Sequence, residues 1–285
     1  NEDVFTNRDV SHAAVTEDGV NWVGFREIFL NEIRNASDFR ARDGVLSSLD
    51  KSVHQFQAIE LPYNKILVSL GQHEASRRTL IFDIGWLYEK TRTEDFQEGL
   101  KNLSTHVYIK SISGTVRSNF AGHCSWNRTH GALLAPDPDA TYGEALQFTR
   151  IHDPRLFSEV QGAVWNFPAT QRGEVTAQLR VSGEGLRFSL ADHWFNPIDT
   201  TIRDFAQFTF DISTDTVARD VWMTVKILFD VQQGFADVIV DNRQIYRAAM
   251  RFPAPCGISY LHLQSMAEAE DFRGSYIRRL KFTAQ

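Results

Sequence analysis

The second half of the chain contains a long series of segments in which apolar and polar residues alternate, and Gly, Pro, Asn and Asp separate one segment from the next. Successive side chains of a β-strand point to opposite faces, so this period of two indicates strands with one buried face. Such strands, with few helical stretches between them, predict a β-sandwich. The predicted strands are Gly131 to Ala135, Glu144 to Thr149, Glu174 to Ser182, Leu186 to Ala191, Ala206 to Ile212, Trp222 to Phe229, Phe235 to Val240, Ile258 to Gln264 and Tyr276 to Phe282.

A meander of three strands is the most telling part of this series. Trp222 to Asp230 and Gly234 to Asn242 alternate on either side of a Gly turn, and a second tight turn leads into Arg243 to Tyr246. This pattern resembles the concanavalin-like (laminin G-like) jelly rolls, and Ser275 to Phe282 resembles the last strand of such a domain. The resemblance covers about Ser104 to Gln285 and implies a lectin-like β-sandwich.

Near the start of the chain, Thr16 to Trp22 has the composition of a hairpin turn. Asp18 could accept backbone N–H groups across the turn, Gly19 could take a positive φ, and Trp22 could pack beneath the hairpin. The segment resembles the Asp-box turn of the sialidase-like (BNR-repeat) β-propellers, with Asn21 in place of the usual Thr and a spacing one residue short. The alternative is an ordinary Asp-Gly hairpin.

The resemblance implies that residues 1–95 are the last one or two blades of a propeller and residues 96–285 the sandwich, because a blade takes roughly 40–50 residues and a closed ring needs several. The other blades would then belong to an N-terminal portion or to a second chain. We expect the chain to associate with them through apolar blade faces. The predicted strands of this part are His12 to Thr16, Trp22 to Leu30, Val53 to Glu60, Lys65 to Gly71 and Arg78 to Asp83, and the apolar residues expected to lack neighbours are Trp22, Phe25, Phe29, Phe56 and Leu67.

Together the two halves resemble the C-terminal part of bacterial BNR/sialidase-like proteins that carry a lectin-like β-sandwich. This resemblance implies part of a secreted or periplasmic carbohydrate-active enzyme, a glycoside hydrolase or polysaccharide lyase, whose glycan could contain an acidic sugar. The arginine set and the Tyr/Glu pair of true sialidases cannot be mapped onto this chain. The alternative is a non-catalytic glycan-binding or structural sandwich with a propeller remnant.

Polar residues at the ends of propeller strands converge on the central channel, and on this basis the candidate catalytic residues are His54, His73, Arg78 and Glu27. A histidine or a carboxylate with a shifted pKa could act as acid or base, and an arginine could hold a substrate carboxylate. Arg26 and Gln55 are candidate substrate-binding residues. Each could instead be a structural hydrogen-bonding group, and Arg26 and Glu27 should point to opposite faces of their strand.

A second candidate site follows the boundary between the two halves. His123, Trp126, Asn127 and Arg128 offer a stacking plane and several donors, which is how proteins hold sugars. The alternative is that Trp126 and Cys124 pack an interface between the two halves. A polar-aromatic loop from Asp192 to Asn196 could also serve as a sugar platform or anchor its rings in the core.

Charge and hydropathy narrow the partner classes. A net charge of −6 without a basic tract argues against a nucleic-acid partner, and no apolar run approaches the length of a membrane span. No cofactor or metal is required by the sequence. Calcium could bind the carboxylates of Asp230, Asp237 and Asp241, but each sits where a turn carboxylate caps backbone N–H groups. Cys124 and Cys256 could pair or stay free.

Overall fold

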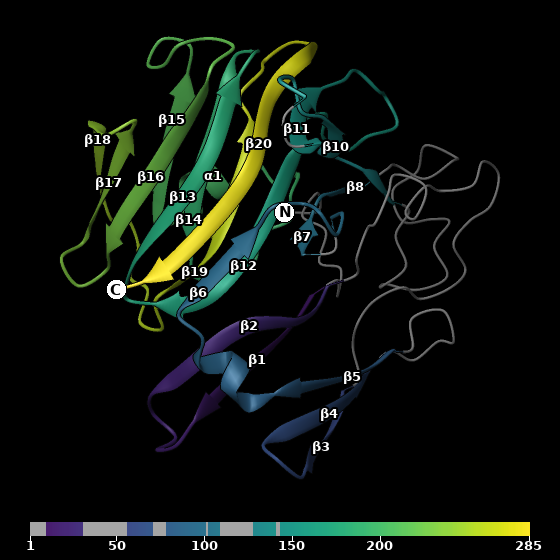
Figure 1. Cartoon of the computed structure of the whole chain (residues 1–285), viewed down its shortest axis with the longest axis vertical. Coiled ribbons are helices and arrows are strands. Elements are labelled where there is room, and N and C mark those ends of the chain that lie inside the picture. Colours follow the sequence, from purple (N-terminus) through teal and green to yellow (C-terminus); the bar gives the residue numbers. More distant parts are fainter. Residues whose placement is uncertain (1–9, 31–55, 71–77, 101, 109–127, 141–142) are drawn as a thin grey trace.

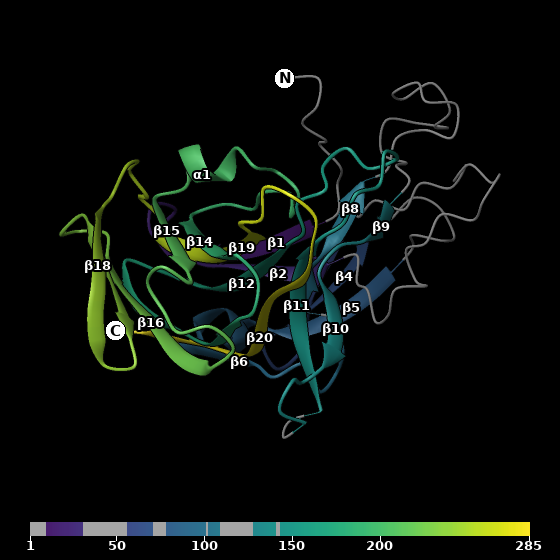
Figure 2. The same cartoon turned by 90° about the horizontal axis from the view of Figure 1, so that it is seen from above.

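The computed structural model describes residues 10–30, 56–70, 78–100, 102–108, 128–140 and 143–285. Within these ranges strands make up nearly all of the regular structure, and the helical elements are the short 3-10 helix η2 (Ile84–Tyr88) and the single turn α1 (Ile202–Phe205). Two antiparallel sheets face each other across a common core (Figures 1 and 2). The all-β sandwich predicted from the alternating segments is therefore confirmed.

The larger sheet has eight strands. Seven of them follow one path, and β6 pairs with the C-terminal part of β20 beside β11. In spatial order the path is β10 (Leu133–Pro136), β11 (Glu144–Arg150), β20 (Asp271–Ala284), β13 (Arg172–Val181), β16 (Trp222–Asp230), β17 (Phe235–Val240) and β18 (Arg243–Ala249), with β6 (Thr91–Glu94) off it.

The smaller sheet has five strands and forms the second layer, which Figure 2 shows from above. Its order is β15 (Phe208–Ser213), β14 (Gly185–Ala191), β19 (Ile258–Ser265), β12 (Gly162–Thr170) and β7 (Leu103–Ser104). The edge strands β15 and β18 of the two sheets lie next to each other.

The core between the sheets is apolar and rich in aromatic rings. In β13 every second residue is buried, which is the alternation expected of a strand with one inward face. Phe167 stacks on Phe282 with ring centroids 4.2 Å apart, and the Phe229 ring centroid lies 6.5 Å from that of Phe167. These rings join β12 to β20 and β16, so burial of aromatic surface holds the two layers together.

The N-terminal elements form a hairpin and a small sheet. The hairpin is β1 (Val10–Thr16) with β2 (Trp22–Leu30), the three-stranded sheet is β3 (Gln57–Leu61), β4 (Lys65–Leu70) and β5 (Arg78–Asp83), and β8 (His106–Tyr108) pairs with β9 (Arg128–His130). Among the described residues these elements do not close a ring of blades.

The hairpin turn has the geometry predicted for it. Asp18 Oδ1 accepts the backbone N–H groups of Val20 at 2.8 Å and Asn21 at 2.7 Å, and Gly19 has a φ of 76°. These bonds, that from Asn21 first, hold the pKa of Asp18 well below its usual range. Trp22, however, is 48% exposed, so the prediction that it packs beneath the hairpin is wrong.

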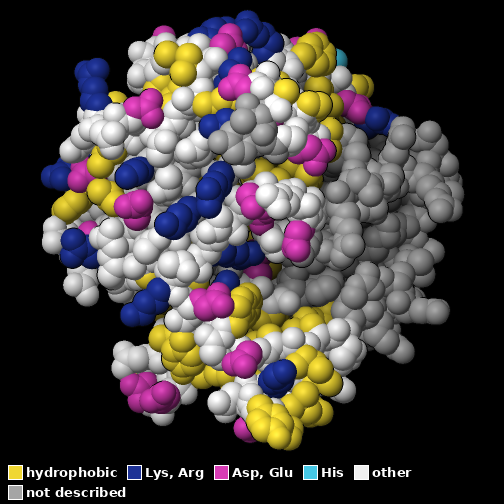
Figure 3. All heavy atoms as spheres, in the orientation of Figure 1, with side chains coloured by type: hydrophobic (Ala, Val, Ile, Leu, Met, Phe, Trp, Pro, Cys, Tyr) yellow, Lys and Arg dark blue, Asp and Glu magenta, His cyan; other side chains and the backbone are white. Residues whose placement is uncertain are grey.

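The small sheet leaves an apolar surface in solvent. Figure 3 shows hydrophobic side chains gathered over the lower part of the molecule, where β1 to β5 lie. Ile59 and Ile81 are exposed by 57% and 56%, and Phe56 by 54%. Trp22 is exposed as well, whereas Phe25 and Leu67 are half-buried, and the expectation that further blades cover these side chains stays a prediction. The side chain of Phe29 and the residue Cys124 lie outside the described part, and Cys256 is exposed before β19.

Candidate functional site

Most of the residues proposed from the sequence lie outside the described part of the chain. Arg78 begins β5 and Arg128 begins β9, and only their backbone is described. Arg26 and Glu27 are the two whose side chains can be placed. The residues outside the described ranges are His54, Gln55, His73, His123, Trp126 and Asn127.

Arg26 and Glu27 point to opposite sides of β2, as expected for neighbours in a strand. The Arg26 guanidinium lies 3.8 Å from the Trp86 ring centroid and donates to Glu89 Oε2 at 2.8 Å. Glu27 faces the smaller sheet, where its backbone N–H donates to Asn166 Oδ1 at 3.1 Å. Both residues help to dock the hairpin, and their predicted roles at a substrate site stay predictions.

The environment of Glu27 changes its protonation. Burial raises the pKa of its carboxyl from 4.5 to about 7, and this outweighs the lowering by the Arg92 charge and by a hydrogen bond from Tyr260. Its Oε1 is buried with no hydrogen-bond partner among the described residues. His12 of β1 shares the Tyr260 hydroxyl through a hydrogen bond from the other side. This cluster lies between the hairpin and the smaller sheet.

A different set of polar and aromatic side chains lies on the outer face of the larger sheet. Four strands place residues directly opposite one another there: Gln147 of β11 pairs with Tyr276 of β20, Tyr276 with Arg180 of β13, and Arg180 with Trp222 of β16. We call these four residues the aromatic–arginine row. They cross three strand spacings, about 14 Å, with one guanidinium between two aromatic rings. All four are half-buried.

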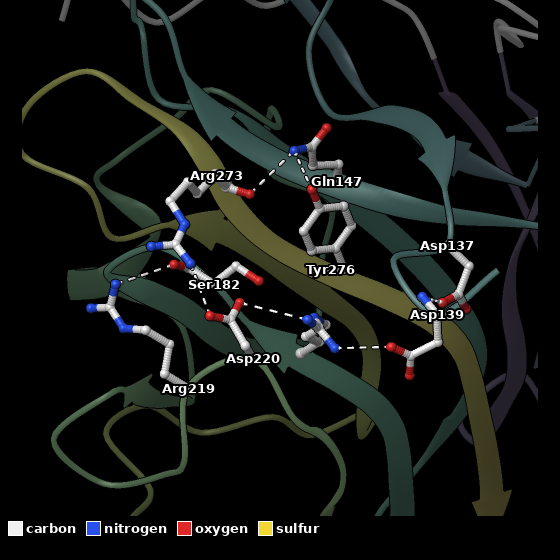
Figure 4. A network of polar contacts seen from close by, with 9 residues as sticks. Asp137, Asp139, Gln147, Ser182, Arg219, Asp220, Arg273 and Tyr276 are labelled. Carbon is white, nitrogen blue, oxygen red and sulfur yellow. Dashed lines mark hydrogen bonds and ion pairs between the residues drawn. The ribbon is translucent and has the colours of Figure 1, made fainter. Parts of the chain in front are cut away.

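Neighbouring side chains fix the row in place. Gln147 Nε2 donates to the Tyr276 hydroxyl at 2.7 Å (Figure 4). The Arg278 guanidinium lies 4.4 Å from the Trp222 ring centroid, and its Nη2 donates to Gln178 Oε1 at 2.9 Å. A cation held on a ring face in this way positions both groups.

Two carboxylates pair with Arg180, in the middle of the row. Arg180 Nη1 donates to Asp139 Oδ1 at 3.2 Å, and its Nη2 lies 3.7 Å from Asp220 Oδ1 (Figure 4). Asp220 also accepts Arg273 Nη2 at 2.8 Å. A hydrogen bond with Ser182, followed by the charges of Arg273 and Arg180, lowers the pKa of Asp220, so this carboxylate is ionised at neutral pH.

Three buried polar atoms at this face have no hydrogen-bond partner among the described residues: Asp137 Oδ2, Arg180 Nε and Trp222 Nε1. The Asp137 carboxylate is fully buried, and its Oδ2 lies 3.9 Å from Arg278 Nη1, beyond hydrogen-bond distance. Buried polar atoms without partners cost free energy unless water or a ligand bonds them. All three atoms are shielded from solvent, so they belong to the inner packing of the row and not to the surface that a ligand would contact.

The chemistry of the row suits a hydroxyl-rich ligand. Aromatic rings supply a stacking surface, and amide and guanidinium groups supply donors in fixed directions. Burial raises the pKa of Tyr276, so its hydroxyl stays neutral. Figure 3 shows Lys and Arg side chains over the sheet that faces the viewer, with acidic side chains among them.

None of the four residues of the row was predicted from the sequence as part of a site. Its members lie far apart in the chain, and only the strand pairing brings them together. Trp222 and Tyr276 open two of the predicted strands, and alternation alone puts them on one face of those strands. That signal was available, but the order of the strands was not.

The aspartates considered for calcium have protein partners. Asp230 Oδ1 accepts the Gln233 N–H and Asp241 Oδ1 accepts the Thr224 N–H, both at 2.9 Å, which agrees with the turn-cap alternative. Asp237 instead pairs with Arg247 at 2.6 Å. The described residues hold no group of three or more His, Cys, Asp or Glu side chains placed for a metal ion. No described helix is long and apolar enough to cross a membrane.

Comparison with known proteins gives distant structural similarities only. No family model matches the chain, and no curated protein matches it. Similar solved structures include a sialidase (11% identity, TM-score 0.41, 79% of this chain and 21% of that one), lectin II from Ulex europaeus (12%, 0.43, 68% and 98%) and a glycoside hydrolase family 16 endo-glucanase from Bacteroides ovatus (9%, 0.38, 67% and 99%). The chain thus covers about a fifth of the sialidase. Likeness at this level does not identify a ligand or an activity.

Proposed function

We propose that this chain binds a glycan through the aromatic–arginine row on the outer face of its larger sheet. The observation that carries the proposal is the row itself: Tyr276, Arg180 and Trp222 stand side by side on three paired strands. Stacking on the rings and hydrogen bonds to the amide and guanidinium groups would both contribute to binding.

An acidic sugar fits the row better than a neutral one. Arg180 and Arg278 are only 16% and 15% exposed, so a sugar carboxylate would meet guanidinium groups that are already partly desolvated. Hydrogen bonds between charged groups are stronger than those between neutral groups, and guanidinium can bind a carboxylate with two parallel bonds. Asp139 and Asp220 already pair with Arg180, so a sugar carboxylate would compete with them for this guanidinium, and the row would accept no more than one acidic unit.

The experiment is binding of the intact chain to neutral and uronate-containing oligosaccharides, first on an array and then by titration calorimetry. We expect Arg180→Gln to weaken binding of the uronate ligand about tenfold, the loss of one charge-assisted contact. Tyr276→Phe removes one hydroxyl and should weaken binding less. Arg243→Gln, an exposed change on the edge strand β18, is the matched control and should leave affinity unchanged.

Equal affinity of Arg180→Gln and the unchanged chain, with both folded by circular dichroism, would contradict this site. Binding that is lost equally in Arg243→Gln would point to a general charge effect instead of a site.

We further propose that the glycan is a substrate of a glycoside hydrolase or polysaccharide lyase, and that this enzyme is secreted or periplasmic. The activity would reside in a larger protein in which further blades complete a site around His54, His73 and Arg78. The His54→Ala/His73→Ala double variant of that protein should lose turnover. Its aromatic–arginine row should still bind glycan. Retained turnover would contradict the assignment of these histidines.

A further inference from the structure

A second group of basic side chains lies at the other sheet, where the edge strands β15 and β18 meet. A pocket of about 380 Å³ is lined there by four arginines from four parts of the chain: Arg187 of β14, Arg203 of α1, Arg247 of β18 and Arg251 just beyond β18. We call it the arginine pocket. None of its members belongs to the aromatic–arginine row.

Two of the four arginines are held by tight ion pairs. Arg187 donates to both oxygens of Asp211, at 2.7 and 2.8 Å, and this pairing raises the pKa of the guanidinium. Arg247 donates to both oxygens of Asp237 at 2.6 Å and lies 4.3 Å from the Phe235 ring centroid. These pairs fix two walls of the pocket and leave little charge to attract an anion.

The other two arginines are less engaged. Arg251 Nη2 donates to the neutral hydroxyl of Thr209 at 2.7 Å, and within the described residues it forms no ion pair with a carboxylate. Arg203 lies 3.4 Å from the carboxylate of its neighbour Asp204, and both side chains are more than half exposed, so solvent weakens that pair. The Thr209 hydroxyl also donates to the backbone oxygen of Arg203 at 3.4 Å, so the segment that carries Arg203 lies beside the Thr209 contact of Arg251.

The charge count leaves the pocket positive. Four guanidinium groups face Asp204, Asp211 and the Asp237 carboxylate bound to Arg247, for a formal charge of +1. Guanidinium is planar and presents paired donors that match an oxyanion. Tyr246, 53% exposed, lines the same pocket and offers an apolar surface beside the charge.

The pocket does not end at these residues. A neighbouring pocket of about 370 Å³ shares Arg187, Arg203 and Asp204 and extends to Arg150 and Gln264. A ligand longer than a single ion could therefore continue along the smaller sheet from the arginine pocket.

We propose that the arginine pocket is a binding site for an oxyanion carried by an extended ligand, with Arg203 and Arg251 as the groups that bind it. The oxyanion would be a carboxylate, sulfate or phosphate group on that ligand, since each of these presents negatively charged oxygens to a guanidinium group. The site is separate from the glycan-binding row and does not depend on it.

The test is titration of the intact chain with sodium sulfate, inorganic phosphate and sodium glucuronate at constant ionic strength. Binding is monitored through the side-chain Nε–Hε signals of arginine in NMR spectra. Saturable shifts confined to a few arginines are expected. They should weaken about tenfold in Arg251→Gln and in Arg203→Gln, and should persist in Arg243→Gln, which lies on the same strand as Arg247 but outside the pocket. Binding of sulfate and phosphate alone assigns a tetrahedral oxyanion, and binding of glucuronate assigns a carboxylate.

Two outcomes would overturn the proposal. One is the absence of saturable shifts with all three anions. The other is binding that survives the Arg203→Gln/Arg251→Gln double variant with both proteins folded. The Arg180→Gln variant separates the two sites, because it should leave the anion shifts unchanged whether or not the row binds glycan.

Discussion

Replacing Glu27 by glutamine should remove one source of pH dependence from the stability of this protein. In the folded chain burial raises the pKa of Glu27 from 4.5 to about 7. Between these two values the folded chain keeps the proton and the unfolded chain releases it, so folding takes up a proton. The contribution of Glu27 to stability therefore falls as pH rises through this window, and the full penalty applies above pH 7.

The size of the penalty follows from the two pKa values. Their difference, at about 1.36 kcal/mol per pKa unit, corresponds to roughly 3 kcal/mol. The amide introduced by Glu27→Gln would be neutral at every pH and would avoid this penalty. The variant should thus gain up to roughly 3 kcal/mol relative to the unchanged chain between acidic pH and pH 8, over and above any constant cost of seating an amide beside Tyr260 and Arg92.

The assay is urea unfolding of both proteins at closely spaced pH values from 4 to 8.5, with the difference in free energy of unfolding plotted against pH. His262, whose pKa is lowered to about 4 by burial, titrates in both proteins and cancels in the difference. His12 shares the Tyr260 hydroxyl with Glu27, but its pKa is lowered to about 4, so any change in its titration would fall at the acid end of this pH range. Glu60→Gln, an exposed change on β3, is the control and should give a flat line.

A flat difference curve for Glu27→Gln would refute the reasoning, because it would mean that Glu27 has the same pKa in the folded and unfolded chain. A rising curve for Glu60→Gln would show instead that a general charge effect is being measured.

Three further changes test the fold. Phe167→Ala should lower the free energy of unfolding by about 3–5 kcal/mol in denaturant unfolding, because the ring is fully buried and contacts Phe282 and Phe229; a loss below about 1 kcal/mol would contradict its place in the core. Gly274→Ala should prevent or greatly weaken folding, measured by thermal melting, since an added Cβ would lie 2.0 Å from the Phe148 carbonyl oxygen at a φ of +61°. Asp18→Ala should speed hydrogen exchange at the hairpin-turn amides and leave exchange in β13 unchanged, and equal exchange at the turn would contradict the bonding described for Asp18.

Alternation in the sequence predicted the sandwich strands well wherever one face of the strand is buried. Trp222 to Phe229 and Phe235 to Val240 match β16 and β17 almost residue for residue. Strand β12 was missed because its first seven residues are all buried: the N-terminal hairpin and the segment that contains α1 both cover its outer face, so polar residues do not alternate along it. Strand β6 was missed because it lies in a polar segment, and only its pairing with β20 gives it a strand partner.

The candidate sites also show which features can be predicted from neighbouring residues and which depend on strand pairing. A hairpin turn such as Thr16 to Trp22 is encoded by neighbouring residues, and its hydrogen bonds could be predicted from them. The aromatic–arginine row depends on which strands pair and in which register, and β11, β20, β13 and β16 are consecutive in space but not in sequence. A shift of one residue in any of these pairings would turn its member of the row into the core.

The buried alternation of β13 therefore protects the candidate site as well as the fold. Val181 and Leu179 on either side of Arg180 are buried, and moving them outward would expose apolar side chains while burying a guanidinium. The same packing that excludes this slip holds Arg180 between Tyr276 and Trp222. The position of the row is thus a consequence of core packing, which explains why local sequence patterns could indicate the strands of this sheet without revealing the surface that they build together.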